Sequence, residues 1–419
     1  MGSVQFVSVL SFMIVMPLGP DFTLALGIPP SHVGWVTASY TLSAALSGIV
    51  SALFIDRYDR RPALGIAMTG LVLCNVAAGL AVDLASLMVA RAAAGMFGGP
   101  AGALAIAVVA DNVPPERRGR AMGTVMGGLS VSSVVGLPLS LELARLAGWR
   151  STFFTVAALG LVIVAAALFL LPPQRRHLAE AEAGGAAPAG TGVMAAAASA
   201  VMRLLRIAAR PNALLALALA AVAIVPGFLV VTNLAVYVQF NLGFPREQLG
   251  LLYMIGGAVS FFGMRWTGQA VDRFGSTGVT TVTTLALVTL IYLLYLDWSW
   301  LALPVMALVP TWILFNTARM VAQNTAISKV PAAAERAGFM ALVQSVTQVS
   351  AAAGAVLGAA ILDTAPDGRL EHMPTVAGLA IAIGIAGPPL MWALERRLPR
   401  SAPESHRVKA AAQVSAPER

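Results

Sequence analysis

Charged residues are scarce in this sequence of 419 residues. Asp, Glu, Lys and Arg together make up 11% of it, whereas a soluble globular domain carries about 25%. Hydrophobic residues make up 58%. This deficit of charge excludes an ordinary water-facing surface over most of the molecule and indicates that lipid is its solvent.

Cysteine, histidine and phosphate-binding loops are also rare or absent. The single cysteine, Cys74, lies in an apolar run, so no intramolecular disulfide can form. The four histidines fall in expected loops or the tail, and none lies near Cys74 or a carboxylate pair at metal-ligand spacing. The sequence has no Gly-x-x-x-x-Gly-Lys loop to hold ATP. We therefore expect no metal, no cofactor and no catalytic residues, and an enzyme is the weakest functional class.

Basic residues exceed acidic ones, 27 to 19, which gives a net charge of +8. They fall in short clusters between apolar segments and do not form one phosphate-binding face. Such clusters are typical of cytoplasmic loops that face anionic lipid. We therefore expect a lipid bilayer, and no nucleic acid, as a partner.

Apolar runs of about 20 residues are long enough to cross the hydrocarbon core as helices. Twelve runs qualify, and we interpret the first as a retained helix and not a signal peptide. The pattern predicts an all-α integral membrane protein with twelve transmembrane helices in two six-helix bundles. The predicted spans are residues 4–26, 34–55, 63–82, 86–110, 120–143, 151–172, 212–239, 248–270, 278–296, 301–327, 339–362 and 375–395.

The longest non-spanning stretch divides the spans six by six. Its first half is rich in Ala and Gly, which predicts flexibility. In its second half Arg203, Arg206 and Arg210 recur at helical spacing, which indicates either an interfacial amphipathic helix or an extension of the seventh span. The predicted regions are an N-terminal bundle (1–173), a cytoplasmic linker (174–210), a C-terminal bundle (211–396) and a cytoplasmic tail (397–419).

Lysines and arginines between the spans set the expected orientation, because they concentrate in cytoplasmic loops. Twenty fall on one side of the predicted topology and four on the other. We therefore expect a multi-pass protein of the cell (inner) membrane with both termini in the cytoplasm. The four expected outside are Arg145, Arg150, Arg246 and Arg369.

Similar loop sequences recur at a nearly constant offset. Asp56, after the second span, aligns with Asp272, after the eighth, at a distance of 216 residues. Glu116, after the fourth span, aligns with Glu335, after the tenth, at 219 residues. Two loops that repeat in this way indicate duplicated halves, as in many secondary transporters.

These loops resemble the Gly-x-x-x-Asp-Arg-x-Gly-Arg-Arg motif of the major facilitator superfamily. Ala52 and Asp59 stand where the family has glycines, and the second copy lacks the final basic pair. The resemblance implies a gating role in which the Asp caps and latches neighbouring helix ends when the protein is open outward. Alternatively, the charges only terminate helices and set topology. The matching residues are Asp56, Arg57, Arg60 and Arg61 in the first copy, and Gly268, Asp272, Arg273 and Gly275 in the second.

The fourth span reads Arg91-Ala-Ala-Ala-Gly95, which looks like the family's Arg-x-x-x-Gly motif, linked to proton coupling in drug antiporters. The fifth span has Gly136-Leu-Pro138 without the glycine pair that follows in the antiporter signature, so the coupling mode stays open. The surrounding segment is similar to bacterial sugar-efflux and drug-efflux permeases of the drug:proton antiporter-like branch.

Asp21 and Arg91 are ionisable groups at the same predicted depth, and the resemblance implies that their helices are neighbours. Charges inside a membrane are costly and mark functional sites by default. We predict that Asp21 and Arg91 pair, and that protonation of Asp21 breaks the pair and favours outward opening. The alternative is that Asp21 is a solvated helix-end residue after Pro17 and Pro20.

A polar stripe on the tenth span is the second intramembrane feature. Arg319 shares a helical face with Asn316 and Gln323, and such a stripe should face the bundle interior or a watery cavity. We predict a central substrate cavity near the midplane, the alternative being hydrogen bonds between helices. The cavity candidates are Tyr40, Asn233, Tyr237, Asn316, Arg319, Gln323, Gln344 and Gln348.

These features favour a monomeric secondary transporter that exports a small drug-like or sugar-like molecule by alternating access, with protons as the expected coupling ion. A lipid or lysolipid exporter of the same fold is a rival, because a largely apolar cavity with few polar anchors suits such a substrate. A membrane sensor that keeps the fold without transport is a third reading. Fold analogy alone does not decide among them.

Overall fold

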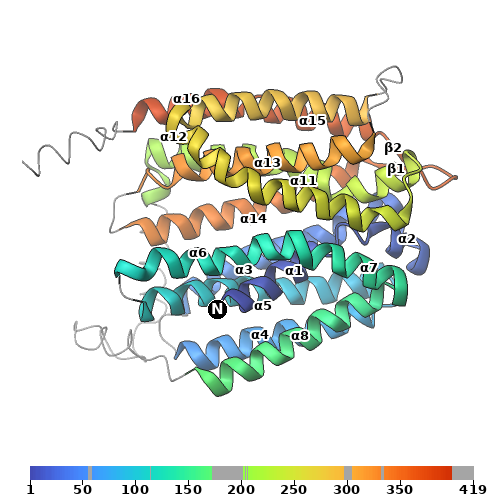
Figure 1. The fold of residues 1–419 in the computed structure, drawn as a ribbon, viewed down its shortest axis with the longest axis horizontal. Helices are drawn as coiled ribbons and strands as arrows, with labels where there is room; N and C mark the ends of the chain where they lie inside the picture. The colour runs from blue at the N-terminus through green and yellow to red at the C-terminus, as the bar shows by residue number, and fades with distance from the viewer. Residues whose placement is uncertain are drawn as a thin grey trace, which may run out of the picture.

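The computed structural model describes residues 1–54, 59–113, 115–171, 202, 204, 206–296, 304–331 and 335–398. Long helices run side by side along the longest axis (Figure 1). Asp56 and Arg57, most of the linker and the tail from residue 399 lie outside the described residues. The predicted all-helical membrane fold is confirmed, because nine of the described helices are long and apolar enough to cross a membrane.

The N-terminal half forms the lower part of Figure 1. Its fifth predicted span is one continuous rod of α6, a π-helical turn and α7. The elements are α1 (Gly2–Met13), α2 (Gly19–Leu26), η1 (Pro30–His32), α3 (Val33–Phe54), α4 (Arg60–Gly79), α5 (Leu84–Asn112), α6 (Pro115–Val131), η3 (Ser132–Gly136), α7 (Leu137–Ala147) and α8 (Trp149–Leu170).

The C-terminal half forms the upper part. Its two short strands pair antiparallel, with Asp363 opposite Glu371. The elements are α11 (Pro211–Val236), η4 (Tyr237–Asn241), η5 (Arg246–Gln248), α12 (Leu249–Tyr295), α13 (Val305–Ile327), α14 (Arg336–Ile361), β1 (Asp363–Thr364), β2 (Leu370–Glu371), α15 (Met373–Gly384) and α16 (Gly387–Arg397).

Several of the predicted spans differ from simple rods. The first is broken into α1 and α2 around Pro17, because proline has no N–H to continue the helical ladder. The eighth and ninth are joined in α12, where Gly275 has φ 76° and marks the bend between them. This backbone angle lies in the left-handed region, which glycine adopts without steric cost.

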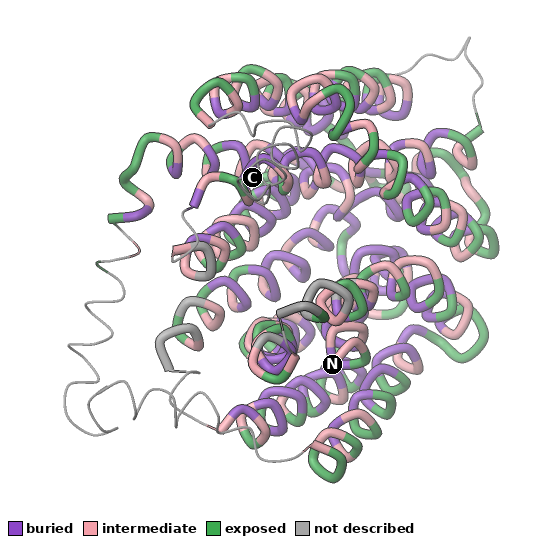
Figure 2. The backbone as a smooth tube through the Cα atoms, turned by 60° about the vertical axis from the view of Figure 1, so that its left-hand side comes forward, coloured by how far each residue is buried: buried purple, intermediate pink, exposed green. Residues whose placement is uncertain are grey.

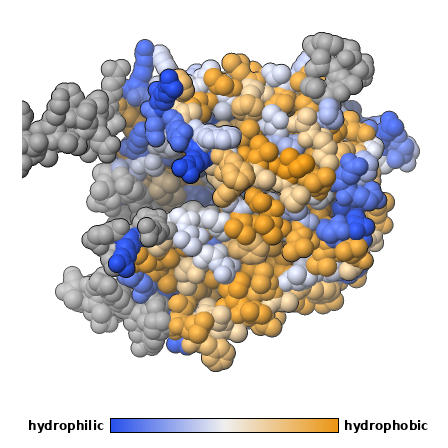
Figure 3. Space-filling model, viewed as in Figure 1, coloured by the Kyte–Doolittle hydropathy of each residue, from blue (hydrophilic) through white to orange (hydrophobic). Residues whose placement is uncertain are grey.

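Each half has its own apolar core. Residues of α1 to α5, α7 and α8 form most of one cluster, and residues of α11, α12, α13 and α15 form most of a second. Buried residues lie on the helix sides that face other helices (Figure 2). Large apolar side chains such as Phe169 and Trp266, 87% and 70% exposed, lie on the outside, which is the arrangement expected of a lipid-facing surface. Hydrophobic residues cover the middle of the face in Figure 3, and hydrophilic ones gather at its two ends.

The two halves meet near the β1–β2 hairpin, which we call the hairpin end. There Thr364 Oγ1 donates to Ser31 Oγ at 3.0 Å and accepts from the Ser31 N–H at 3.2 Å. Val33 of the N-terminal half belongs to the core cluster of the C-terminal half. At the same end α3 packs closely on α14, where a Cβ at Gly34 would lie 2.7 Å from the Ala355 carbonyl oxygen. These contacts join the halves at the hairpin end. The opposite end of the molecule is where α4 begins and α16 ends (Figure 1).

Candidate functional site

Arg91 lies in the interior of the N-terminal half, fully buried on α5. Its Nη1 donates to Ser11 Oγ at 3.4 Å, and Ser11 Oγ in turn donates to Asn75 Oδ1 at 3.0 Å. Its guanidinium lies over the Tyr40 ring, 4.6 Å from the centroid. In the described part of the chain no carboxylate forms an ion pair with it. A cation–π contact and one neutral acceptor hold this buried charge.

Asp21 does not pair with Arg91, so that prediction is wrong for this structure. Asp21 accepts two hydrogen bonds from Arg246, Nη2–Oδ2 at 2.8 Å and Nε–Oδ1 at 3.3 Å. The break around Pro17 is the physical reason, because α2 does not continue the axis of α1 and lies at the hairpin end (Figure 1). The proton-coupling roles assigned to the two residues stay predictions.

A row of rings leads from Arg91 to the other half. Tyr40 lies between Arg91 and Phe12, with 5.3 Å between the Tyr40 and Phe12 ring centroids. Phe12 stacks on Phe228 of α11 with centroids 6.2 Å apart and ring planes 28° apart. Phe12 and Phe228 are each half-buried. This aromatic pair is a direct contact between the two halves that sequence analysis missed, because isolated phenylalanines in apolar spans carry no signal of their own.

Gly95 explains the spacing of the Arg91 motif. It lies one turn after Arg91, where α5 crosses α3 so closely that a Cβ would meet the Tyr40 carbonyl oxygen at 2.2 Å. The same Cβ would lie 2.2 Å from Ser43 Oγ. The glycine therefore lets the two helices approach, which places the Tyr40 ring against the guanidinium.

The first gating loop is described from Asp59 onward. Asp59 caps α4 by accepting a hydrogen bond from the Arg61 N–H at 3.0 Å. Arg60 is buried, and its Nε lies 2.6 Å from Asp111 Oδ2 at the end of α5. Arg61 donates to the Leu168 carbonyl of α8. Arg60 and Arg61 thus tie the start of α4 to the ends of α5 and α8.

The second loop copy is built differently. Asp272 and Arg273 are exposed on α12, and Arg273 lies over the Phe274 ring. After the bend at Gly275, the helix start is capped by Glu395 of α16, which accepts from the N–H groups of Ser276 and Thr277. A Cβ at Gly268 would meet nothing within 4 Å. A carboxylate does cap this helix start, but it comes from a helix that the loop motif does not include.

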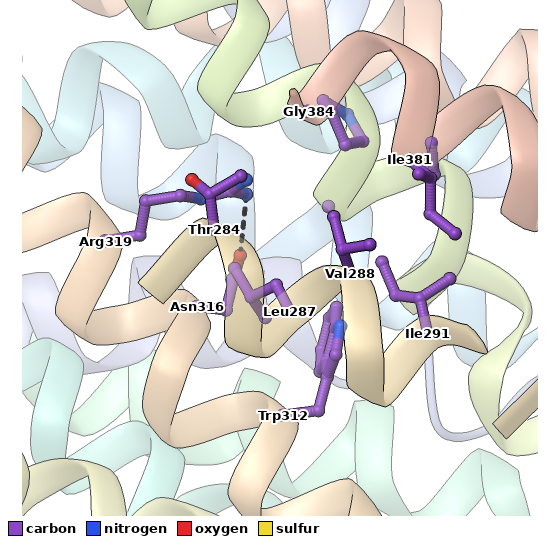
Figure 4. Close-up of a pocket in the computed structure, with 12 residues that line it drawn as sticks. Thr284, Leu287, Val288, Ile291, Trp312, Asn316, Arg319, Ile381 and Gly384 are labelled. Atoms are coloured by element: carbon purple, nitrogen blue, oxygen red, sulfur yellow. Dashed lines mark hydrogen bonds between the residues drawn. The ribbon is translucent and has the colours of Figure 1, made fainter. Parts of the chain in front are cut away.

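The polar stripe on α13 faces the interior of the C-terminal half. Arg319 Nη2 donates to the Ala223 carbonyl of α11 at 3.0 Å and to Asn316 Oδ1 at 3.2 Å. Arg319 and Asn316 line a pocket bounded by α11, α12, α13 and α15 (Figure 4). Gln323 is buried two turns from Asn316. The predicted grouping around one central cavity is therefore not what this structure shows, because the stripe packs against helices of its own half.

The other cavity candidates lie elsewhere. Tyr40 belongs to the Arg91 row described above. Asn233 is buried on α11, and the Tyr237 ring lies 4.7 Å from the Tyr295 ring, both within the C-terminal half. On α14, Gln344 is exposed and Gln348 is half-buried.

A charge cluster at the hairpin end joins the halves. Besides the Asp21–Arg246 pair, Glu142 and Arg145 of α7 form an ion pair. Arg246 interacts electrostatically with Glu142, and Glu247 with Arg145. On the opposite end, hydrogen bonds from Arg210 to Glu335 raise the pKa of the Arg210 guanidinium. Ion pairs therefore lie at both ends of the molecule. Arg210–Glu335 lies within the C-terminal half, whereas Asp21–Arg246 joins the two halves at the hairpin end.

This chain is similar in sequence to a family model and to known membrane proteins. A family model described as Major Facilitator Superfamily matches residues 1–355. The inner membrane transport protein YdhP of Escherichia coli K12 is 28% identical over 37% of this chain and 41% of that protein. The chloramphenicol resistance protein of Streptomyces lividans is 27% identical over 61% of this chain and 62% of that protein. The matches span less than two thirds of either relative.

The fold has counterparts among solved structures. The xylose transporter XylE from E. coli, in a partially occluded inward open conformation, superposes with a TM-score of 0.68. That match covers 94% of this chain and 95% of XylE at 14% sequence identity. At this identity the likeness concerns the fold alone.

Proposed function

We propose that this chain, which belongs to the Major Facilitator Superfamily, exports drug-like amphipathic compounds by alternating access with protons as the coupling ion. It is a secondary transporter by family and not an enzyme. Distant relatives include a chloramphenicol resistance protein, which supports efflux of a small organic compound. The YdhP relative is called an inner membrane protein, and we place this chain in the same kind of membrane with both termini in the cytoplasm.

The aromatic pair between the halves is the observation that carries the substrate class. Phe12 and Phe228 are half-buried and stacked, with Tyr40 behind Phe12. The apolar Ile313 packs against the cores of both halves. Rings at this position favour flat, partly apolar compounds, because stacking contributes about 0.5–1.5 kcal/mol per pair beyond the area buried. A sugar would need several hydrogen-bonding groups in their place.

The contacts between the halves at the hairpin end support alternating access. We place the substrate path at the boundary of the halves, with the hairpin end facing outward and the opposite end facing the cytoplasm. The Asp21–Arg246 pair holds the hairpin end together. Protonation of Asp21 removes one of its charges and favours opening of that end. Arg91, through Tyr40 and Phe12, connects the N-terminal interior to the substrate path.

Proteoliposomes provide the test. We expect a pH gradient to accelerate transport of an aromatic cationic dye, and Phe12→Ala and Phe228→Ala each to raise KM by roughly fivefold, which corresponds to about 1 kcal/mol of lost stacking. Phe169→Ala is the matched control, since that side chain is 87% exposed on the outside of the bundle. Equal KM values for all three variants would contradict the proposal that the aromatic pair lines the substrate path. Dye transport that ignores the gradient would rule out proton coupling.

A further inference from the structure

A buried guanidinium without a carboxylate lies in the C-terminal half, apart from the boundary of the halves. Arg319 is 4% exposed. Its two acceptors, the Ala223 carbonyl and the Asn316 amide oxygen, are neutral. No acidic side chain within the described ranges forms an ion pair with it, and its Nε has no hydrogen-bond partner. A cation in a medium of low dielectric is costly unless a negative charge compensates it.

Hydrogen-bond donors around Arg319 are also unsatisfied. Gln323 is 2% exposed, and neither its amide nitrogen nor its oxygen has a partner among the described residues. Thr284 is 3% exposed, and its hydroxyl also has no hydrogen-bond partner among the described residues. Buried polar groups in folded proteins almost always have a partner. Several unpartnered donors next to an unpaired cation indicate a site for a negatively charged acceptor.

Glycines of α15 and α16 leave space beside these donors. A Cβ at Gly384 would lie 3.9 Å from Arg319 Nη1. A Cβ at Gly387 would lie 3.9 Å from Gln323 Nε2 and 4.0 Å from Thr284 Oγ1. Arg319, Asn316 and Thr284 line the pocket together with the apolar Trp312 and Val288 (Figure 4). Arg319 and Thr284 thus reach one small pocket whose remaining wall is largely apolar, and Gln323 lies beside Thr284 next to Gly387.

We propose that this pocket is a binding site for a small monovalent anion, held by Arg319 with help from Thr284 and Gln323. The anion is either a free inorganic ion such as chloride or the carboxylate of a small solute. The lining residues come from α11, α12, α13 and α15, so the site is internal to the C-terminal half. Pro226 and Gly227, which line it, directly precede Phe228 on α11. The site therefore borders the backbone that positions the aromatic pair.

The test measures the unfolding midpoint of the purified protein in sodium chloride, sodium formate and sodium gluconate at equal ionic strength. A ligand that binds the folded state raises the midpoint in a saturable way. We expect such a rise with chloride or formate relative to gluconate, which is too large for the pocket, and its loss in Arg319→Gln. A rise with chloride identifies a free ion, and a rise with formate alone identifies a carboxylate. Equal midpoints in all three salts would overturn the proposal.

Two further variants distinguish binding in the pocket from binding at the protein surface and from a folding defect. Arg265→Gln removes an exposed arginine of α12 and should keep the full anion effect. An effect that survives Arg319→Gln but disappears in Arg265→Gln would assign the anion to the surface and overturn the proposal. Gly384→Val keeps the charge but fills space next to Arg319 Nη1, so it tests the pocket if Arg319→Gln does not fold. We expect it to raise the half-saturating anion concentration at least tenfold, and an unchanged value contradicts the site.

Discussion

Arg246 holds Asp21 across the boundary between the two halves, although 225 residues separate them in sequence. Both side chains are mostly shielded from solvent, with 17% and 18% exposure. The pair lies at the end where the halves also share the Ser31–Thr364 hydrogen bonds. Under the proposed alternating access these groups separate once in each cycle, and we therefore expect the pair to control the opening of this end.

Replacing Asp21 should open the hairpin end. Hydrogen bonds to charged groups contribute about 1.5–3 kcal/mol, so Asp21→Asn should shift the balance between the two openings by about tenfold or more. The measurement is the rate of disulfide crosslinking between Ser31→Cys and Thr364→Cys in a Cys74→Ala background, which should fall. Acid on the hairpin side slows crosslinking in both proteins because it protonates the thiols, and with Asp21 intact the rate should fall further than in Asp21→Asn. Arg369→Gln, at an exposed pair within the loop between β1 and β2, is the control.

Gly95 should tolerate no side chain. A Cβ there would lie 2.2 Å from a backbone oxygen of α3, and backbone cannot move aside as a side chain can. Gly95→Ala should cost at least about 2 kcal/mol of stability, measured as a lower unfolding midpoint, and should displace Tyr40 from Arg91. Gly123→Ala is the comparison, because nothing lies within 4 Å of its Cβ. Equal midpoints for the two variants would mean that α3 and α5 do not approach so closely.

The Glu395 cap should stabilise the helix start after Gly275. Glu395 accepts from two backbone N–H groups and from Thr277 Oγ1 at 2.6 Å. Because a carboxylate is favoured at a helix N-terminus, Glu395→Gln should cost about 1–2 kcal/mol. Thermal unfolding compared with Glu371→Gln, an exposed residue of β2, measures it. If Glu395→Gln loses no more stability than Glu371→Gln, the negative charge of Glu395 does not contribute to the cap.

The Arg60–Asp111 pair should contribute more than a surface ion pair. Arg60 is 7% exposed and Asp111 25%, so Asp111→Asn replaces the charged acceptor beside a buried cation with a neutral amide. We expect a loss of about 1–3 kcal/mol. Asp367→Asn removes the partner of the exposed Arg369 and should change stability by less than about 1 kcal/mol. Chemical denaturation of both variants in the same detergent compares them, and equal losses contradict the prediction.

Much of the fold was predictable because lipid imposes a simple rule on sequence. Long apolar runs must form helices that satisfy their own backbone, and the repeated loops around Asp56 and Asp272 indicated duplicated halves. The Arg91–Gly95 spacing also pointed to a real packing feature. By contrast, the first span was predicted as one rod, although Pro17 and Pro20 were visible in it.

The sequence by itself determined which segments are helices, which of them are apolar and which positions carry rare charges. Only the tertiary structure decided the partners of those charges. A helical stripe such as Asn316, Arg319 and Gln323 tells which side of α13 is polar, but not which neighbour that side meets. Asp21 pairs with Arg246 and not with Arg91, because the bend at Pro17 turns α2 away from the axis of α1. Residues so far apart in sequence meet only after the halves pack. Local preferences act within a helix, whereas ion pairs and stacked rings depend on how whole helices are placed.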